Sequence, residues 1–265
     1  METIETLPHD YAICLVGHGT RDNNGVSEFL ALSSKVKDRE PDRIIESGFL
    51  DLAKPTFEEA IAKCAQGKIN NIVVIPALLI SASHAKKDIP NRIIKMSRQF
   101  PGLNIKYGRP LGFHPKILTV CSERIEETER NSISSIARTD TLLITVAHGS
   151  NDPSVNLTTA KVPQTLSDSM GFSGFKTSFI GINQPLLSET LERSIKMGFK
   201  RIIVFPYFLF TGVLTKRINS TVDDIQKKHP EIELLKAQYL KHHELIIDVF
   251  MERAREAPFV LQDTN

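Results

Sequence analysis

The stretch CLVGHGTRD at residues 14–22 is an apolar run that ends in a Gly-His-Gly sequence typical of a tight turn after a strand. The stretch TVAHGSND at 145–152 repeats this pattern, and its His148 follows His18 by 130 residues. The same separation joins two further pairs, Pro55 with Pro185 and Pro76 with Pro206. Near the end of each copy the separation slips by one residue, as in Leu111 with Leu240 and His114 with His243. The pattern therefore indicates an internal duplication of roughly 130 residues, each copy large enough to be a domain.

Short apolar runs alternate with longer amphipathic stretches in both copies. Strands are predicted at 11–16, 44–50, 71–80 and 104–107, and again at 141–147, 177–182, 201–210 and 232–236. Helices are predicted at 24–38, 56–66, 87–99 and 115–130, and again at 155–168, 186–197, 216–228 and 243–255. Apolar strands that alternate with helices are typical of a parallel sheet covered on both faces. The expected fold class is α/β, with two tandem doubly wound domains that each contain a parallel four-stranded sheet.

The junction of the two copies is predicted within 131–140, where NSISSIARTD is polar and rich in serine. The expected domains are an N-terminal half at 1–135 and a duplicated C-terminal half at 136–258. Residues 259–265 are expected to form a loose tail.

Composition excludes several classes of protein. The chain has 33 basic and 31 acidic residues among 265, so no overall basic field favours nucleic acid. Its three cysteines are widely separated and form no CxxC, which supports neither a disulfide framework nor a cysteine metal site. The first residues, METIETLPHD, do not resemble a signal peptide, and no apolar run is long enough to span a bilayer. We expect a cytoplasmic protein in a reducing compartment, with no membrane partner.

Chemistry-bearing residues follow three strands of the first half. His18 follows the first predicted strand, Asp51 the second and His84 the third. In such sheets ligands bind beyond the carboxyl ends of the strands, so the three side chains are expected at one edge. Two imidazoles and a carboxylate suit a divalent transition metal, and imidazole also accepts protons near neutral pH. The second half keeps His148 but has Gly181 and Leu214 in the other two places, so we expect it to be a structural lobe.

The ordered motifs carry a resemblance to a known family. The segments VGHGT, FLDLAKP, PALLISASHAKKDIP and RPLGFHP together resemble the class II tetrapyrrole metal chelatases, most closely the long sirohydrochlorin chelatases with two fused halves. The resemblance covers nearly the whole chain. It implies an enzyme that inserts Co²⁺ or Fe²⁺ into sirohydrochlorin without ATP, on the route to cobalamin or sirohaem. It also implies that the family's two active-site histidines are His18 and His84 here.

Two departures from the family pattern bear on these expectations. Family members usually have Glu where this chain has Asp51, so the carboxylate is one methylene shorter, and Glu46 is the nearby alternative. Some long members carry a His-rich tail or a Cys-based cluster. This chain ends in PFVLQDTN, and we expect no iron–sulfur cluster and no cofactor beyond the substrate metal.

Metal insertion requires the macrocycle to lose two pyrrole N–H protons and the metal ion to lose its water. We expect His18 and His84 to hold the metal and accept these protons, while Asp51 orients a histidine or balances charge. Because the tetrapyrrole bears many carboxylates, the expected substrate-binding residues are Arg21, Ser81, Ser83, Lys86, Lys87 and Arg92. Since two fused halves can replace a symmetric dimer, a monomer is expected.

Two other functions stay open at this point. One is a carrier that binds a tetrapyrrole or a metal without catalysis. The other is a histidine phosphatase, although such a site needs Arg directly before the histidine and this chain has Gly17 there. A chelatase for nickel or for another porphyrinoid is a closer variant.

Overall fold

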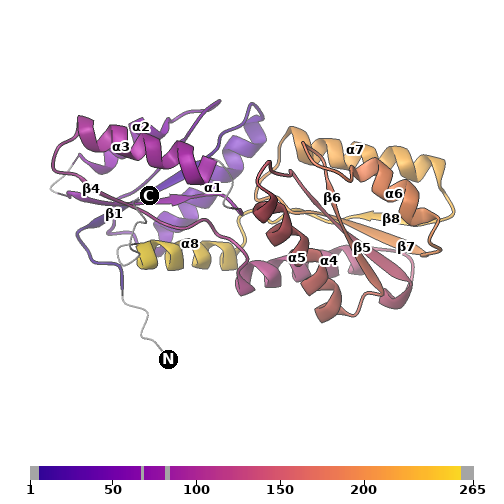
Figure 1. Cartoon of the computed structure of the whole chain (residues 1–265). Helices are drawn as coiled ribbons and strands as arrows, with labels where there is room; N and C mark the ends of the chain where they lie inside the picture. The colour runs from indigo at the N-terminus through magenta and orange to yellow at the C-terminus, as the bar shows by residue number, and fades with distance from the viewer. Residues whose placement is uncertain (1–5, 67–68, 81–83, 258–265) are drawn as a thin grey trace. The chain divides into compact units, whose positions relative to one another are not determined.

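A computed structural model of the chain describes residues 6–66, 69–80 and 84–257 (Figure 1). The side chain of His84 is not among the described atoms. The chain forms two compact units, one of residues 1–114 with 242–265 and the other of residues 115–241.

The first unit is built on a parallel sheet with the strand order β2-β1-β3-β4. Its strands are β1 (Tyr11–Gly17), β2 (Ile45–Phe49), β3 (Asn71–Pro76) and β4 (Asn104–Tyr107). Its helices are α1 (Asn23–Arg39), α2 (Phe57–Cys64), α3 (Ile89–Gln99) and α8 (Glu244–Glu256), with one π-helical turn, η1 (His84–Asp88), before α3. The register places Gly17 beside Phe49, so β1 and β2 end next to each other.

The second unit repeats this topology with the order β6-β5-β7-β8, again parallel. Its strands are β5 (Thr141–Ala147), β6 (Gly174–Phe179), β7 (Arg201–Pro206) and β8 (Glu233–Lys236). Its helices are α4 (Pro115–Arg130), α5 (Pro153–Met170), α6 (Leu187–Ile195) and α7 (Val213–Lys228), with a 3₁₀ turn, η2 (Arg138–Asp140), before β5. The predicted α/β fold with two parallel four-stranded sheets is confirmed.

Three strand predictions were wrong in their bounds. β3 and β7 stop at Pro76 and Pro206, although the apolar runs continue, because proline has no N–H to donate to the next ladder bond. β6 starts at Gly174, three residues before the prediction, because Gly174 and Phe175 already pair with Leu142 and Leu143 of β5, and it ends at Phe179.

The duplication is visible in local geometry. Helices α1 and α5 both begin after an N-cap aspartate, Asp22 or Asp152, with φ −87° and ψ 111° in each case. Each cap carboxylate accepts a hydrogen bond from the backbone N–H two residues on, at 3.0 Å, which satisfies a donor that a helix start leaves open. Gly19 and Gly149 have φ of +93° and +91°. The two sheet edges therefore share one design of strand, glycine turn and capped helix.

The one-residue slip in the repeat has a structural origin. The buried residues of α3 and α7 correspond at a separation of 129, as Ile89 with Ile218 and Ile93 with Val222. The separation is still 130 at Pro76, so the first half has one extra residue between Pro76 and Ile89. The first half has the π-helical turn η1 there, whereas α7 of the second half begins as an α-helix at Val213. A π turn holds one more residue than an α turn, and such insertions are frequent at functional sites.

The compact units differ from the predicted halves at 1–135 and 136–258. Helix α4 comes from the first half but packs against α5, and its Arg124 donates a hydrogen bond to the backbone oxygen of Leu240 at 3.2 Å. Helix α8 comes from the second half but packs against α1, where Lys35 meets Glu244 at 2.8 Å. Each unit thus contains the helix that ends the other half of the sequence: α4 ends the first half and lies in the second unit, and α8 ends the second half and lies in the first unit. The two helices occupy equivalent positions in the two copies of the repeat.

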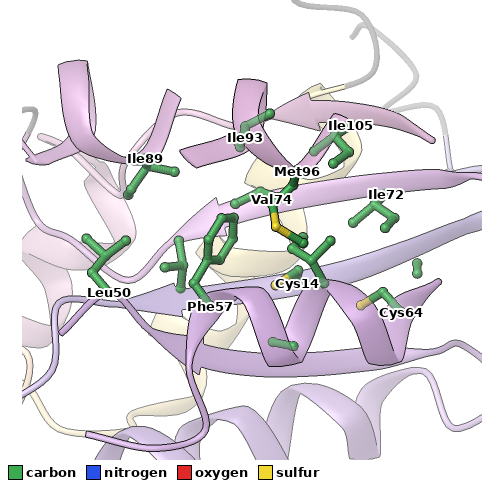
Figure 2. Packing of buried hydrophobic residues seen from close by; sticks show 14 residues of the cluster. Cys14, Leu50, Phe57, Cys64, Ile72, Val74, Ile89, Ile93, Met96 and Ile105 are labelled. Carbon is green, nitrogen blue, oxygen red and sulfur yellow. The ribbon is translucent and has the colours of Figure 1, made fainter. Parts of the chain in front are cut away.

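The core of the first unit lies between its sheet and the helices α2 and α3. Figure 2 shows the cluster, whose buried members include Phe57, Val74, Ile89 and the thiols of Cys14 and Cys64. A hydrogen bond with Cys64, together with burial, raises the pKa of the Cys14 thiol. The third cysteine, Cys121, is buried in the second unit, and burial raises its pKa as well. All three thiols therefore serve as small apolar groups in the core.

Among the described residues no helix is long and apolar enough to cross a membrane.

Candidate functional site

His18 and Asp51 come together at the carboxyl edge of the first sheet. They follow the neighbouring strands β1 and β2, and the backbone N–H of Asp51 donates to the oxygen of His18 at 3.0 Å. The preceding residue extends the same ladder, because the N–H of Leu50 donates to Gly17 at 2.9 Å. Sequence reasoning placed both residues at this edge, and the backbone of each is held against the other.

Glycines make this close approach possible. A Cβ on Gly17 would lie 3.3 Å from the rings of both Phe29 and Phe49, whose centroids are 4.7 Å apart behind the turn. A Cβ on Gly19 would overlap the backbone oxygen of Asp51, and Gly19 has φ +93°. The aromatic pair and the neighbouring strand therefore fix the backbone on either side of His18. The imidazole itself is partly exposed, with its Nδ1 atom shielded from solvent.

Arg92 of α3 holds the carboxylate of Asp51. Its guanidinium donates to Oδ1 of Asp51 at 2.9 Å and, through the other terminal nitrogen, to Oε1 of Glu58 at 3.1 Å. Asp51 remains 55% exposed, so its carboxylate still faces solvent at the edge of the sheet. The expected substrate-binding residue Arg92 thus engages two carboxylates of the protein itself.

The segment around His84 is anchored by a tyrosine that sequence reasoning missed. His84 begins the π turn η1, and the hydroxyl of Tyr107 in β4 donates to the backbone oxygen of Ala85 at 3.0 Å. Ala85 is itself buried. Burial raises the pKa of Tyr107 far above its usual value, so the hydroxyl keeps its proton and remains a donor. The side chain of His84 and the residues Ser81 and Ser83 lie outside the described residues.

Replacing Tyr107 by phenylalanine is expected to lower the activity of the protein several-fold, because the π turn that carries His84 is held less firmly. The free energy of unfolding should fall by about 1 kcal/mol, the usual loss for one hydrogen bond. The π turn would lose the contact that ties it to β4. Activity and the urea midpoint of unfolding measure the two effects. Tyr11→Phe, at the opposite end of the same sheet, is the matched control and should leave activity unchanged. Equal activity in Tyr107→Phe and Tyr11→Phe would contradict an anchoring role.

Three further expected substrate-binding cations are exposed. Arg21 lies in the turn between β1 and α1, and Lys86 and Lys87 lie on the π turn. Their exposure leaves the charges accessible to an anionic ligand.

The second sheet has a different arrangement at the same edge. The N–H of Gly181 donates to the oxygen of His148 at 3.1 Å, as in the first unit. A Cβ on Gly181, the counterpart of Asp51, would lie 2.4 Å from the backbone oxygen of His148 and 2.5 Å from Cδ2 of its ring. Leu214, the counterpart expected for His84, packs against the apolar core. This edge has an imidazole but no room for the carboxylate.

Sequence reasoning also missed Glu58. It lies in the first turn of α2, beside the capping box of Thr56 and Glu59, where an acidic residue is common for reasons of helix stability alone. Aligning the two halves could have pointed to Glu58 and its partner Arg92. Both are charged in the first half, whereas the corresponding residues of the second half are the uncharged Ser188 and Thr221.

The remaining histidines near this region have structural partners. His114 lies 3.1 Å from Glu252, and the ring of His243 accepts a hydrogen bond from Leu245 as the N-cap of α8. Among the described side chains no three His, Cys, Asp or Glu residues gather closely enough to hold a metal. An imidazole and a carboxylate from adjacent strand ends can share a divalent ion with a further ligand, and the imidazole can accept a proton.

Both halves of the chain match one known protein family. A family model described as CbiX matches the chain twice, over residues 12–128 and 142–257. The chain is 34% identical to a sirohydrochlorin cobaltochelatase of Priestia megaterium, over 92% of this chain and 79% of that protein. It is 30% identical to a sirohydrochlorin ferrochelatase of the same organism, over 92% and 89% of the two chains.

Solved structures agree with these relatives. The chelatase SirB from Bacillus subtilis subspecies spizizenii in complex with cobalt has a TM-score of 0.77 and 26% identity, over 93% of this chain and 94% of that chain. SirB from Bacillus subtilis with Fe³⁺ has a TM-score of 0.81 and 27% identity, over 93% and 95%. The two matches to the family model fall one in each copy of the duplication.

Proposed function

The chain belongs to the CbiX family, and from that premise we propose that it is a sirohydrochlorin chelatase that inserts Co²⁺ or Fe²⁺ without ATP. The observation that carries the proposal is the pair of His18 and Asp51, held at adjacent strand ends by backbone hydrogen bonds. Relatives that share most of this chain's length are named for cobalt and for iron. The product would serve cobalamin or sirohaem synthesis.

In the proposed reaction the metal ion is a substrate and the macrocycle releases two protons. His18 and His84 hold the ion and accept the pyrrole N–H protons as the four nitrogens replace water and imidazole on the metal. Asp51 balances the charge of the ion or orients an imidazole. Neutral imidazoles suit both tasks near neutral pH, because they bind borderline metals and take up protons there.

The first half of the chain, 1–135, carries the proposed catalytic residues. Arg21, Lys86 and Lys87 pair with carboxylates at the rim of the tetrapyrrole, and Ser81 and Ser83 add hydrogen bonds. The crowding of His148 against Gly181 supports a structural role for the second half. We further propose that the protein acts in the cytoplasm as a monomer and needs no cofactor besides the substrate metal.

The proposal is tested by mixing the purified protein, without ATP, with sirohydrochlorin or protoporphyrin and with Co²⁺, Fe²⁺ or Ni²⁺ in parallel, under anaerobic conditions. Insertion is followed by the absorbance change of the tetrapyrrole, against a control without protein. We expect Co²⁺ or Fe²⁺ to be inserted faster than in the control, and protoporphyrin to remain unmetallated. Tight binding of sirohydrochlorin without any rate increase would replace the enzyme by a carrier and overturn the proposal.

A further inference from the structure

Arg92 links three elements at the edge of the first sheet. It extends from α3, meets Asp51 after β2 and meets Glu58 on α2, with nitrogen–oxygen distances of 2.9 and 3.1 Å. Its side chain is 30% exposed, which is less than either carboxylate. A guanidinium presents its donors in a planar fork, so two bonds to two partners fix its orientation. The carboxylate of Asp51 is therefore held by a group that is itself held from the other side.

The second half of the chain provides an internal comparison for the bridge that Arg92 forms between Asp51 and Glu58. Its buried helical residues correspond to those of the first half, so the equivalent exposed positions are known. Gly181 stands for Asp51, Ser188 for Glu58 and Thr221 for Arg92. The hydroxyl of Thr221 donates to the backbone oxygen of Arg217 within its own helix, at 2.9 Å. All three charged residues are therefore absent where the carboxylate is absent, while the fold around them is the same. The fold does not require the bridge.

The net charge of the bridge suggests different roles for the two carboxylates that Arg92 contacts, Asp51 and Glu58. Asp51 and Arg92 together are neutral, and Glu58 makes the trio carry one net negative charge. A neutral pair would offer a divalent cation little attraction, whereas a net negative trio favours its approach. The bridge reaches only Oδ1 of Asp51, and no other contact to this carboxylate is found among the described residues. Oδ2 can therefore face a metal ion or an imidazole.

We propose that Arg92 is a positioning residue that fixes the Asp51 carboxylate for metal insertion, with Glu58 supporting Arg92 and keeping the trio attractive to the cation. This inference rests on the proposed chelatase function and assigns Arg92 a role other than binding the tetrapyrrole. Groups that orient a metal-binding carboxylate typically change metal affinity or activity by about 10- to 100-fold when they are removed.

The test compares kcat and KM in Arg92→Gln, Arg92→Lys and the unaltered protein. We expect kcat to fall about 10-fold in Arg92→Gln, with the KM for sirohydrochlorin unchanged and activity partly restored in Arg92→Lys. If Arg92 acted only through its charge, Arg92→Gln would make the site more negative. It would then strengthen metal binding and would not lower kcat. A higher KM for sirohydrochlorin with unchanged kcat would assign Arg92 to substrate binding and overturn the proposal.

A double-mutant cycle asks whether Arg92 acts through Asp51. In an Asp51→Asn background, Arg92→Gln should change activity by less than about twofold, because independent sites add and coupled sites do not. The Kd for Co²⁺ without tetrapyrrole is also measured for all four proteins of the cycle. The coupling between Arg92 and Asp51 can then be determined from binding even if Asp51→Asn is too slow to assay. Full additivity in both measurements would contradict the coupling.

Glu58→Gln and a matched surface change complete the design. Glu58→Gln should raise the KM for the metal about two- to fivefold, the range of a partly exposed charge pair, with kcat nearly unchanged. Arg98→Gln removes an exposed arginine from the same helix and should match the unaltered protein. If the unaltered protein inserts no metal, the proposed function fails. If it does and Arg92→Gln equals Arg98→Gln, only the positioning role fails.

Discussion

A His18→Ala variant is expected to insert metal into sirohydrochlorin at least about 100-fold more slowly than the unaltered protein, the usual loss when a group that accepts a proton is removed. The imidazole lies at the end of β1, where its backbone oxygen accepts the N–H of Asp51. Alanine keeps these backbone bonds, so the loss falls on the side chain's chemistry. The initial rate of absorbance change, at saturating Co²⁺ and sirohydrochlorin, measures the effect. His84→Ala is expected to lose a comparable factor.

The duplication supplies the control for this experiment. His148→Ala removes the same residue type from the same position of the second sheet and should leave the rate close to that of the unaltered protein. Thermal unfolding of each variant shows whether the fold is intact. Full activity in His18→Ala, or an equal loss in His148→Ala, would contradict the assignment of the site to the first sheet.

Gly19→Ala is expected to cost about 2–5 kcal/mol of stability, a large effect for one methyl group. Two costs combine, namely overpacking against a rigid neighbour, about 1–3 kcal/mol, and a left-handed backbone in a residue with a Cβ, about 1–2 kcal/mol. The neighbour is the backbone oxygen of Asp51, which cannot rotate away as a side chain can. Relief of the clash must therefore separate Asp51 from His18, so activity should also fall in the protein that remains folded.

Gly102→Ala isolates the contribution of the contact. Gly102 also has a positive φ, +103°, and lies in the same unit, but a Cβ there would meet nothing within 4 Å. It should cost only the backbone term of about 1–2 kcal/mol and leave insertion activity unchanged. Urea unfolding followed by circular dichroism compares the two variants. Equal midpoints and equal activities would show that the approach of Gly19 to Asp51 does not matter.

The alternation of apolar runs and amphipathic stretches determined the two parallel sheets, because burial on both faces requires strands that are apolar throughout. It also determined which residues follow which strand, and hence that His18 and Asp51 share an edge. The repeated spacing of His18 and His148 identified the duplication, and the family motifs identified the chemistry. These features can be predicted because each depends on a short segment whose apolar pattern or motif can be recognised without knowing its partners in the fold.

The partners of these segments depend on tertiary packing, which no single segment encodes. Arg92, Glu58 and Asp51 lie on three separate elements, and the local sequence around Arg92 is that of any amphipathic helix. Tyr107 of β4 likewise donates to Ala85 of the π turn, 22 residues away in the chain. Tertiary packing also placed α4 with the second sheet and α8 with the first. The physical reason is the same in each case: an amphipathic pattern determines which face of a helix is buried, but not which element packs against that face. The choice between them depends on contacts between residues far apart in the chain.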